Sequence, residues 1–181
     1  MKLNKLIAIA TISLLSGGIS MAQKALNLED IVAGNVIQTK GVGSMTWLKD
    51  GERYSRLENN KQTGGTDIVA YQAKDNSREV IIPSSLLTDK STGKPIPVRS
   101  ISWSADNEKV LIYNNTQRVW RYDTRGDYWV LNLKDGALRQ LGKGMPESSM
   151  MFAKFSPDGT RVAYVSNNNI SVSYTHLTLP T

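Results

Sequence analysis

The segment from residue 118 to residue 130 contains the densest group of side chains that could bind a ligand. A guanidinium group presents five N–H donors in a planar fork that suits carboxylate or carbonyl acceptors, and aromatic neighbours can hold it in place. The alternative is a surface on which these side chains simply pack across strands, and composition alone favours packing. The segment holds three arginines, two tryptophans and two tyrosines: Arg118, Arg121, Arg125, Trp120, Trp129, Tyr122 and Tyr128.

Most other chemistry is excluded by composition. The sequence of 181 residues has no cysteine and a single histidine, His176. It therefore offers no thiol nucleophile, no Cys-ligated metal and no multi-histidine site. It also lacks the Gly-x-Ser-x-Gly, His-Glu-x-x-His and phosphate-loop motifs. A Ser-His-Asp triad would have to use His176, which lies in the predicted non-native tail. We therefore expect no catalytic residue, no metal and no cofactor in this chain.

The N-terminus has the pattern of a secretory signal. Two lysines within the first five residues precede an apolar run over residues 6–15, and Ser20 and Ala22 stand where signal peptidase reads small residues. We predict a signal peptide over residues 1–22 and export to the periplasm or cell surface; a retained anchor or an N-terminal core helix is disfavoured. Cleavage of this signal peptide would remove two lysines and no acidic residue, so the formal net charge of the chain would fall from +6 to +4. This mild, scattered charge predicts no nucleic-acid partner.

Three segments of the remaining chain align without gaps and define a repeat. Each has an aromatic anchor, at Trp47, Trp103 or Phe155, with Asp three positions later, Gly or Asn four later and a basic residue six later. Asp-Gly and Asp-Asn favour the positive φ angles of a tight turn between two strands. After the second turn, Val110 and Ile112 alternate with Leu111 and Tyr113, and the third is followed by the same alternation over residues 162–165.

The repeat predicts an all-β fold, a partial β-propeller of about three four-stranded antiparallel blades. Further strands are predicted over residues 67–71, 127–133 and 137–141, and four strands in about 50 residues are typical of a propeller blade, whereas a β-sandwich has no reason to repeat the anchor and turn. Because propellers close with about four to eight blades, we expect residues 23–172 to be the N-terminal part of a larger domain. Residues 173–181 lose the repeat pattern, which indicates a non-native tail; a genuine terminal strand is the alternative.

With these features, residues 25–172 resemble the N-terminal propeller of the dipeptidyl-peptidase IV family of serine exopeptidases, within the prolyl oligopeptidase superfamily, in its Bacteroidetes form. Many propellers share the anchor and turn, so the order, the spacing and the signal peptide carry the resemblance together. The segments that carry it are Leu28-Glu29-Asp30-Ile31, Trp120-Arg121-Tyr122, Phe155-Ser156-Pro157-Asp158-Gly159, Val162-Ala163-Tyr164-Val165 and Asn168-Asn169-Ile170.

The resemblance implies an eight-bladed propeller that caps an α/β-hydrolase domain, in an enzyme that releases Xaa-Pro-type dipeptides from peptide N-termini. It implies that Arg121 donates to a substrate carbonyl, beside a glutamate pair that binds the free amine, with Trp120, Tyr122 and Asp123 as supporting residues. Tyr122-Asp123 replaces the His-Ser that is frequent in the family. The hydrolase domain and the glutamate pair are missing from this chain, so we expect it to be inactive alone. The resemblance also allows a homodimer of the longer protein.

Two other functions stay open. One is a non-enzymatic envelope β-propeller that binds a protein partner. The other is an endo-acting or acylaminoacyl relative in the same superfamily, which would lack the amine-binding glutamates. The uninterrupted sequence beyond Val172 separates them, because only a dipeptidyl peptidase requires both a Glu-Glu motif and a later Gly-x-Ser-x-Gly elbow followed by Asp and His.

Overall fold

The computed structural model describes residues 43–175 together with Leu28, Val32 and Gly41. The predicted signal peptide over residues 1–22 and the histidine at position 176 lie outside the described residues. All of the strands belong to the compact unit Val42–Thr181. In the part of the chain that the structure describes, no helix is long and apolar enough to cross a membrane.

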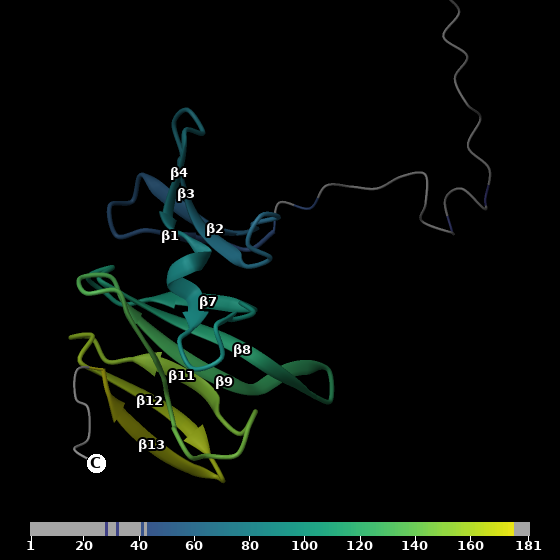
Figure 1. Cartoon of the computed structure of the whole chain (residues 1–181), viewed down its shortest axis with the longest axis vertical. Helices are drawn as coiled ribbons and strands as arrows, with labels where there is room; N and C mark the ends of the chain where they lie inside the picture. The colour runs from purple at the N-terminus through teal and green to yellow at the C-terminus, as the bar shows by residue number, and fades with distance from the viewer. Residues whose placement is uncertain (1–27, 29–31, 33–40, 42, 176–181) are drawn as a thin grey trace, which may run out of the picture. The chain divides into compact units, whose positions relative to one another are not determined.

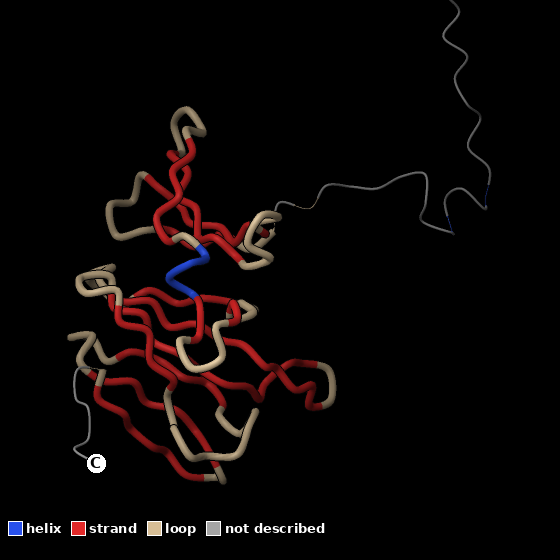
Figure 2. Tube along the Cα trace, in the orientation of Figure 1, coloured by secondary structure: helices blue, strands red, loops and turns tan. Residues whose placement is uncertain are grey.

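Three antiparallel sheets follow one another along this unit, and each is a meander in which neighbouring strands pair in chain order (Figures 1 and 2). We call them blades 1, 2 and 3. Blade 1 contains β1 (Met45–Trp47), β2 (Arg53–Asn59), β3 (Thr66–Gln72) and β4 (Arg78–Ile82). Blade 2 contains β7 (Ser100–Trp103), β8 (Lys109–Val119), β9 (Tyr122–Asn132) and β10 (Ala137–Gln140). Blade 3 contains β11 (Met151–Phe155), β12 (Arg161–Ser166) and β13 (Asn169–Tyr174).

A short connection between blades 1 and 2 is the part of the fold that the sequence pattern did not predict. It consists of the 3₁₀ turn η1 (Ser84–Leu87) and a small hairpin of β5 (Thr88–Asp89) and β6 (Lys94–Pro95). Strand β4 was not predicted either. Elements this short contain too few alternations for a period of two to be recognised. The all-β prediction itself is confirmed, and blades 1 and 2 have the four strands expected of them.

The turn after each aromatic anchor is held by a serine and an aspartate in blades 2 and 3. In blade 2 the Ser104 hydroxyl donates to Asp106 (2.6 Å) and accepts from the Lys109 N–H (2.9 Å). Ser156 makes the corresponding bonds to Asp158 and to the next strand. The residue after each aspartate has the predicted positive φ, 59° at Asn107 and 65° at Gly159. The predicted tight turns are therefore confirmed.

The packing between blades depends on β8, whose residues 110–112 are buried on both faces. Its side chains alternate between two apolar clusters, as the sequence pattern predicted. The cluster between blades 1 and 2 consists of Ile68, Ile82, Leu87, Val110, Ile112 and Leu131. The cluster between blades 2 and 3 consists of Leu111, Tyr128, Val130, Leu141, Met150, Ala153, Val162 and Tyr164. Each blade therefore packs face to face on the next one along the chain.

Blade 3 has a second apolar face that is largely exposed. On β13, Ile170, Val172 and Tyr174 are 79%, 53% and 53% exposed and lie opposite Val165, Ala163 and Arg161 of β12. Single exposed apolar side chains are ordinary, but three in register on one strand form a patch suited to packing against another sheet.

Strand β13 continues past residue 172, where the sequence pattern placed the end of the propeller segment. Ser173 pairs with Val162 and Tyr174 with Arg161, so the antiparallel register is unbroken. The buried Thr175 then donates its hydroxyl to the Gly159 carbonyl (3.0 Å). Residues 173–175 are therefore part of blade 3, and residue 172 is not a boundary in this sheet. Residues 176–181 lie outside the described residues, and the non-native origin of the tail stays a prediction.

Acid should weaken the turn of blade 3. Hydrogen bonds from the Ser156 hydroxyl and from the N–H and hydroxyl of Thr160 hold the pKa of the Asp158 carboxyl well below its ordinary 3.8. Because the folded-state pKa is the lower one, the carboxylate stabilises the fold above that ordinary value and loses this effect as the pH falls. We expect Asp158→Asn to lose less stability than wild type between about pH 7 and about pH 3, measured as the urea midpoint. Equal losses would contradict this.

Leu131 should contribute far more to stability than an exposed side chain of similar size. It is fully buried between blades 1 and 2, so Leu131→Ala leaves a cavity and should lower the free energy of unfolding by about 2–5 kcal/mol. The control Ile170→Ala, on the exposed face of blade 3, should change it by no more than about 0.5 kcal/mol. Urea unfolding measures both, and similar midpoints would argue against packing between the blades as the main source of stability.

Candidate functional site

The β8–β9 hairpin, residues 114–127, continues beyond the other strands of blade 2 (Figure 1). The register of β7 on β8 ends at Tyr113, and that of β10 on β9 ends at Trp129. Beyond those positions β8 and β9 pair with each other as far as Val119 and Tyr122. The long hairpin therefore carries its tip away from the sheet.

The tip consists of Trp120 and Arg121. Trp120 has a left-handed backbone, with a φ of 63°, which is rare for a bulky residue and allows the two-residue turn. Its side chain is 93% exposed and that of Tyr122 is 73% exposed. Arg121 is exposed as well, and no described side chain forms a hydrogen bond or ion pair with its guanidinium. The guanidinium donors are thus available to a ligand.

The arginine and aromatic cluster is therefore divided into a packed part and an exposed part. Tyr128 is buried in the cluster between blades 2 and 3, and Trp129 packs against the cluster between blades 1 and 2. Trp120, Arg121 and Tyr122 instead lie together on the exposed tip, and Asp123 lies in β9 within two positions of it. Packing therefore accounts for Tyr128 and Trp129, and the binding role of the exposed tip stays a prediction.

The base of the hairpin is tightly packed, which the sequence did not indicate. Tyr113 stacks on Tyr128 with ring centroids 4.7 Å apart, and its hydroxyl donates to the Arg125 carbonyl (2.8 Å). A Cβ at Gly126 would lie 2.4 Å from a carbon of the Tyr113 ring. Gly126 also exchanges two backbone hydrogen bonds with Met150, of 3.0 and 3.2 Å. Only glycine allows the Tyr113 ring and the Met150 backbone to approach β9 so closely.

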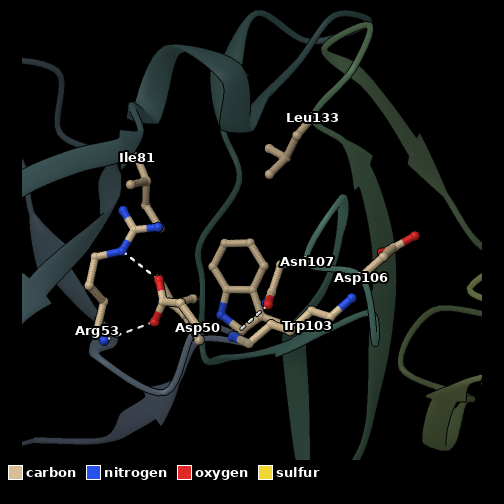
Figure 3. Close-up of a pocket in the computed structure, with 9 residues that line it drawn as sticks. Asp50, Arg53, Ile81, Trp103, Asp106, Asn107 and Leu133 are labelled. Atoms are coloured by element: carbon tan, nitrogen blue, oxygen red, sulfur yellow. Dashed lines mark hydrogen bonds and ion pairs between the residues drawn. The ribbon is translucent and has the colours of Figure 1, made fainter.

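A separate pocket of about 560 Å³ lies between the turns that follow Trp47 and Trp103 (Figure 3). Arg53 donates to Asp50 (2.7 Å), which lowers the pKa of that carboxyl, and the Lys49 N–H donates to Asn107 (2.7 Å). Figure 3 shows the Arg53–Asp50 pair and Asn107 near the Trp103 ring. The pocket lies at the opposite end of β8 from the hairpin tip, and the hydrogen bond from Lys49 to Asn107 joins blades 1 and 2 there.

Comparison with known proteins identifies the part of the chain that contains the hairpin. Residues 104–176 match the family described as the dipeptidyl peptidase IV (DPP IV) N-terminal region. These residues belong to the DPP IV N-terminal region. The match includes β8, β9, Arg121 and all of blade 3.

Curated relatives extend the resemblance over most of the chain. A probable dipeptidyl-aminopeptidase B of Aspergillus terreus is 24% identical over 164 residues, which cover 86% of this chain and 18% of that protein. Dipeptidyl aminopeptidase B of Saccharomyces cerevisiae is 27% identical over 152 residues, which cover 78% of this chain and 17% of that protein. The chain thus spans less than a fifth of the length of these relatives.

The crystal structure of Porphyromonas gingivalis dipeptidyl peptidase 4 superposes with a TM-score of 0.66 at 21% identity. The superposition covers 84% of this chain and 20% of that one. This likeness confirms the fold, a partial β-propeller of the DPP IV type. The functions of Arg121, Trp120, Tyr122 and Asp123 stay predictions within the DPP IV N-terminal region.

Gly126→Ala should distort the base of the hairpin. The added methyl group would overlap the Tyr113 ring and lie 2.6 Å from the Asn114 carbonyl, so the stability should fall by about 1–3 kcal/mol. Gly41→Ala is the control, since no described atom lies within 4 Å of its Cβ position, and should change stability by no more than about 0.5 kcal/mol. Thermal unfolding of both variants measures the difference, and a Gly126→Ala protein as stable as wild type would contradict the close approach.

Proposed function

We propose that this chain is the N-terminal part of the propeller of an exported serine dipeptidyl peptidase that releases Xaa-Pro-type dipeptides from peptide N-termini. In this proposal the propeller restricts access to the active site, and Arg121 binds a carbonyl of the substrate. The observation that carries it is the exposed Arg121 guanidinium at the tip of a long hairpin within the DPP IV N-terminal region. The names of the curated relatives, which are dipeptidyl aminopeptidases, support the reaction.

The chemistry of an exopeptidase favours an arginine in such a place. The enzyme must hold the end of a peptide at a fixed distance from the nucleophile, so it needs charged donors and acceptors on rigid supports. The guanidinium of Arg121 can donate two parallel hydrogen bonds to carbonyl oxygens, and no described side chain competes for them. Trp120, Tyr122 and Asp123 would shape the turn that presents it.

The nucleophile, its triad partners and the glutamates that bind the substrate amine would lie elsewhere in a longer protein. The short share of the relatives' length that this chain covers supports this. The exposed apolar face of blade 3 also supports it, since a further blade packed on Ile170 and Val172 would bury them. On this proposal the chain alone is inactive, because it holds none of the catalytic groups.

Arg121→Ala in the full-length protein should lower kcat/KM for an Xaa-Pro substrate. Removing a charged hydrogen-bond donor from the substrate should cost about 2–4 kcal/mol of transition-state stabilisation, or roughly 30- to 900-fold in kcat/KM. The matched control is Arg118→Ala, which removes the same side chain three positions earlier in the hairpin and should change kcat/KM less than about threefold. Steady-state kinetics of both variants decide the matter, and unchanged kinetics in Arg121→Ala would overturn the assignment.

A further inference from the structure

The base of the β8–β9 hairpin contains a buried carboxylate that the proposed function does not use. Asp127 is 7% exposed, and each of its oxygens accepts one hydrogen bond. Oδ1 accepts from the Ser148 N–H (2.8 Å), and Oδ2 accepts from the Asn115 side-chain amide (2.7 Å). The Ser148 hydroxyl donates to the Asn115 carbonyl (2.6 Å). These three residues, which we call the Asp127 network, join β8, β9 and the segment that precedes β11.

The hairpin needs such a support, because its own strand pairing is irregular. The register of β8 on β9 shifts between Asn114 and Gln117 and again between Gln117 and Arg118. Asn115, inside the first shift, has a left-handed φ of 45°. Regular pairing therefore does not by itself determine the direction in which the tip leaves the sheet.

A small rotation at the base would move the tip a long way. Arg121 lies six positions before Asp127, which corresponds to about 20 Å of extended strand. A rotation of about 10° at the base then displaces Arg121 by roughly 3.5 Å, which exceeds the length of a hydrogen bond. Contacts at the base therefore decide whether the guanidinium reaches a given acceptor.

Blade 1 contains the same arrangement without the long hairpin. Asp67 is 8% exposed; its Oδ1 accepts from the Ser84 N–H (2.7 Å) and its Oδ2 from the Asn60 side-chain amide (3.0 Å). This Asp67 network closes a short turn over residues 60–65. The two blades thus share the same arrangement around a buried carboxylate. In blade 2 this arrangement lies at the base of a longer hairpin that carries Arg121.

We propose that Asp127 is a positioning residue, whose carboxylate determines the direction in which the β8–β9 hairpin presents Arg121. A carboxylate suits the place because donors approach both of its oxygens. Asparagine has nearly the same shape, but its NH₂ group would face one of those two donors. The effect on the hairpin follows from the Asp127 network alone, whereas the effect on catalysis rests on the proposed function.

Hydrogen exchange of the purified chain tests the structural claim directly. Backbone amides of residues 116–124 should exchange about tenfold faster in Asp127→Asn than in wild type, because a buried charged hydrogen bond is lost at their base. The matched control Asp67→Asn should accelerate exchange over residues 60–65 and leave residues 116–124 unchanged. Equal exchange of residues 116–124 in wild type and Asp127→Asn would overturn the proposal.

A milder variant covers the case in which Asp127→Asn does not fold. Ser148→Ala removes only the hydroxyl bond to the Asn115 carbonyl and keeps the backbone N–H that Asp127 accepts. It should accelerate exchange over the same residues by a smaller factor, about threefold. No change in Ser148→Ala, with Asp127→Asn unfolded, would mean that the carboxylate serves only general stability, and the proposal would fail.

Kinetics of the full-length protein test the consequence for Arg121. Asp127→Asn should lower kcat/KM about tenfold in the wild-type background and have no further effect in an Arg121→Ala background. Asp67→Asn should leave kcat/KM unchanged. If Arg121→Ala itself had no effect, the proposed function would fail while the exchange result stood. An equal loss from Asp127→Asn in both backgrounds would instead overturn the positioning role.

Discussion

The burial of β8 on both faces is the constraint on which the rest of the structure depends. Val110 and Ile112 pack toward blade 1, while Leu111 packs toward blade 3. Because successive side chains of a strand point to opposite faces, a slip of one residue would exchange the two sets. Both sets are apolar, so the register of β8 is also held by the turn before it, where the Ser104 hydroxyl donates to Asp106 and accepts from the Lys109 N–H.

The same strand connects the core to the candidate site. Beyond Tyr113, β8 loses its β7 partner and continues with β9 alone, so an element anchored in two apolar clusters becomes an exposed hairpin. Polar contacts lie where the core ends and the exposed hairpin begins. They are the Asp127 network and the hydrogen bond that the Tyr113 hydroxyl donates to the Arg125 carbonyl. An exposed tip built on a rigid core suits a residue that must reach a ligand at a fixed place.

Blade 2 repeats the plan of blade 1 with one alteration, the length of one turn. Blades 1 and 2 share the meander order and a buried aspartate that accepts from an asparagine and a serine at the outer turn. Blade 1 closes this turn within residues 60–65, whereas blade 2 extends it to Trp120 and Arg121. The blade core is kept while the loop beyond it changes, which is the usual way in which a common fold takes on a function.

The sequence by itself determined the all-β class, the repeated turns and the alternation of Val110, Leu111 and Ile112, because turn chemistry and a period of two are local properties. It also singled out Arg121 and Trp120 by composition and family resemblance. Only the tertiary structure decided that Tyr128 and Trp129 pack while Trp120 and Arg121 are exposed, since burial depends on which blade lies opposite. The Asp127 network likewise joins residues up to 33 positions apart, and no local pattern indicates such a contact.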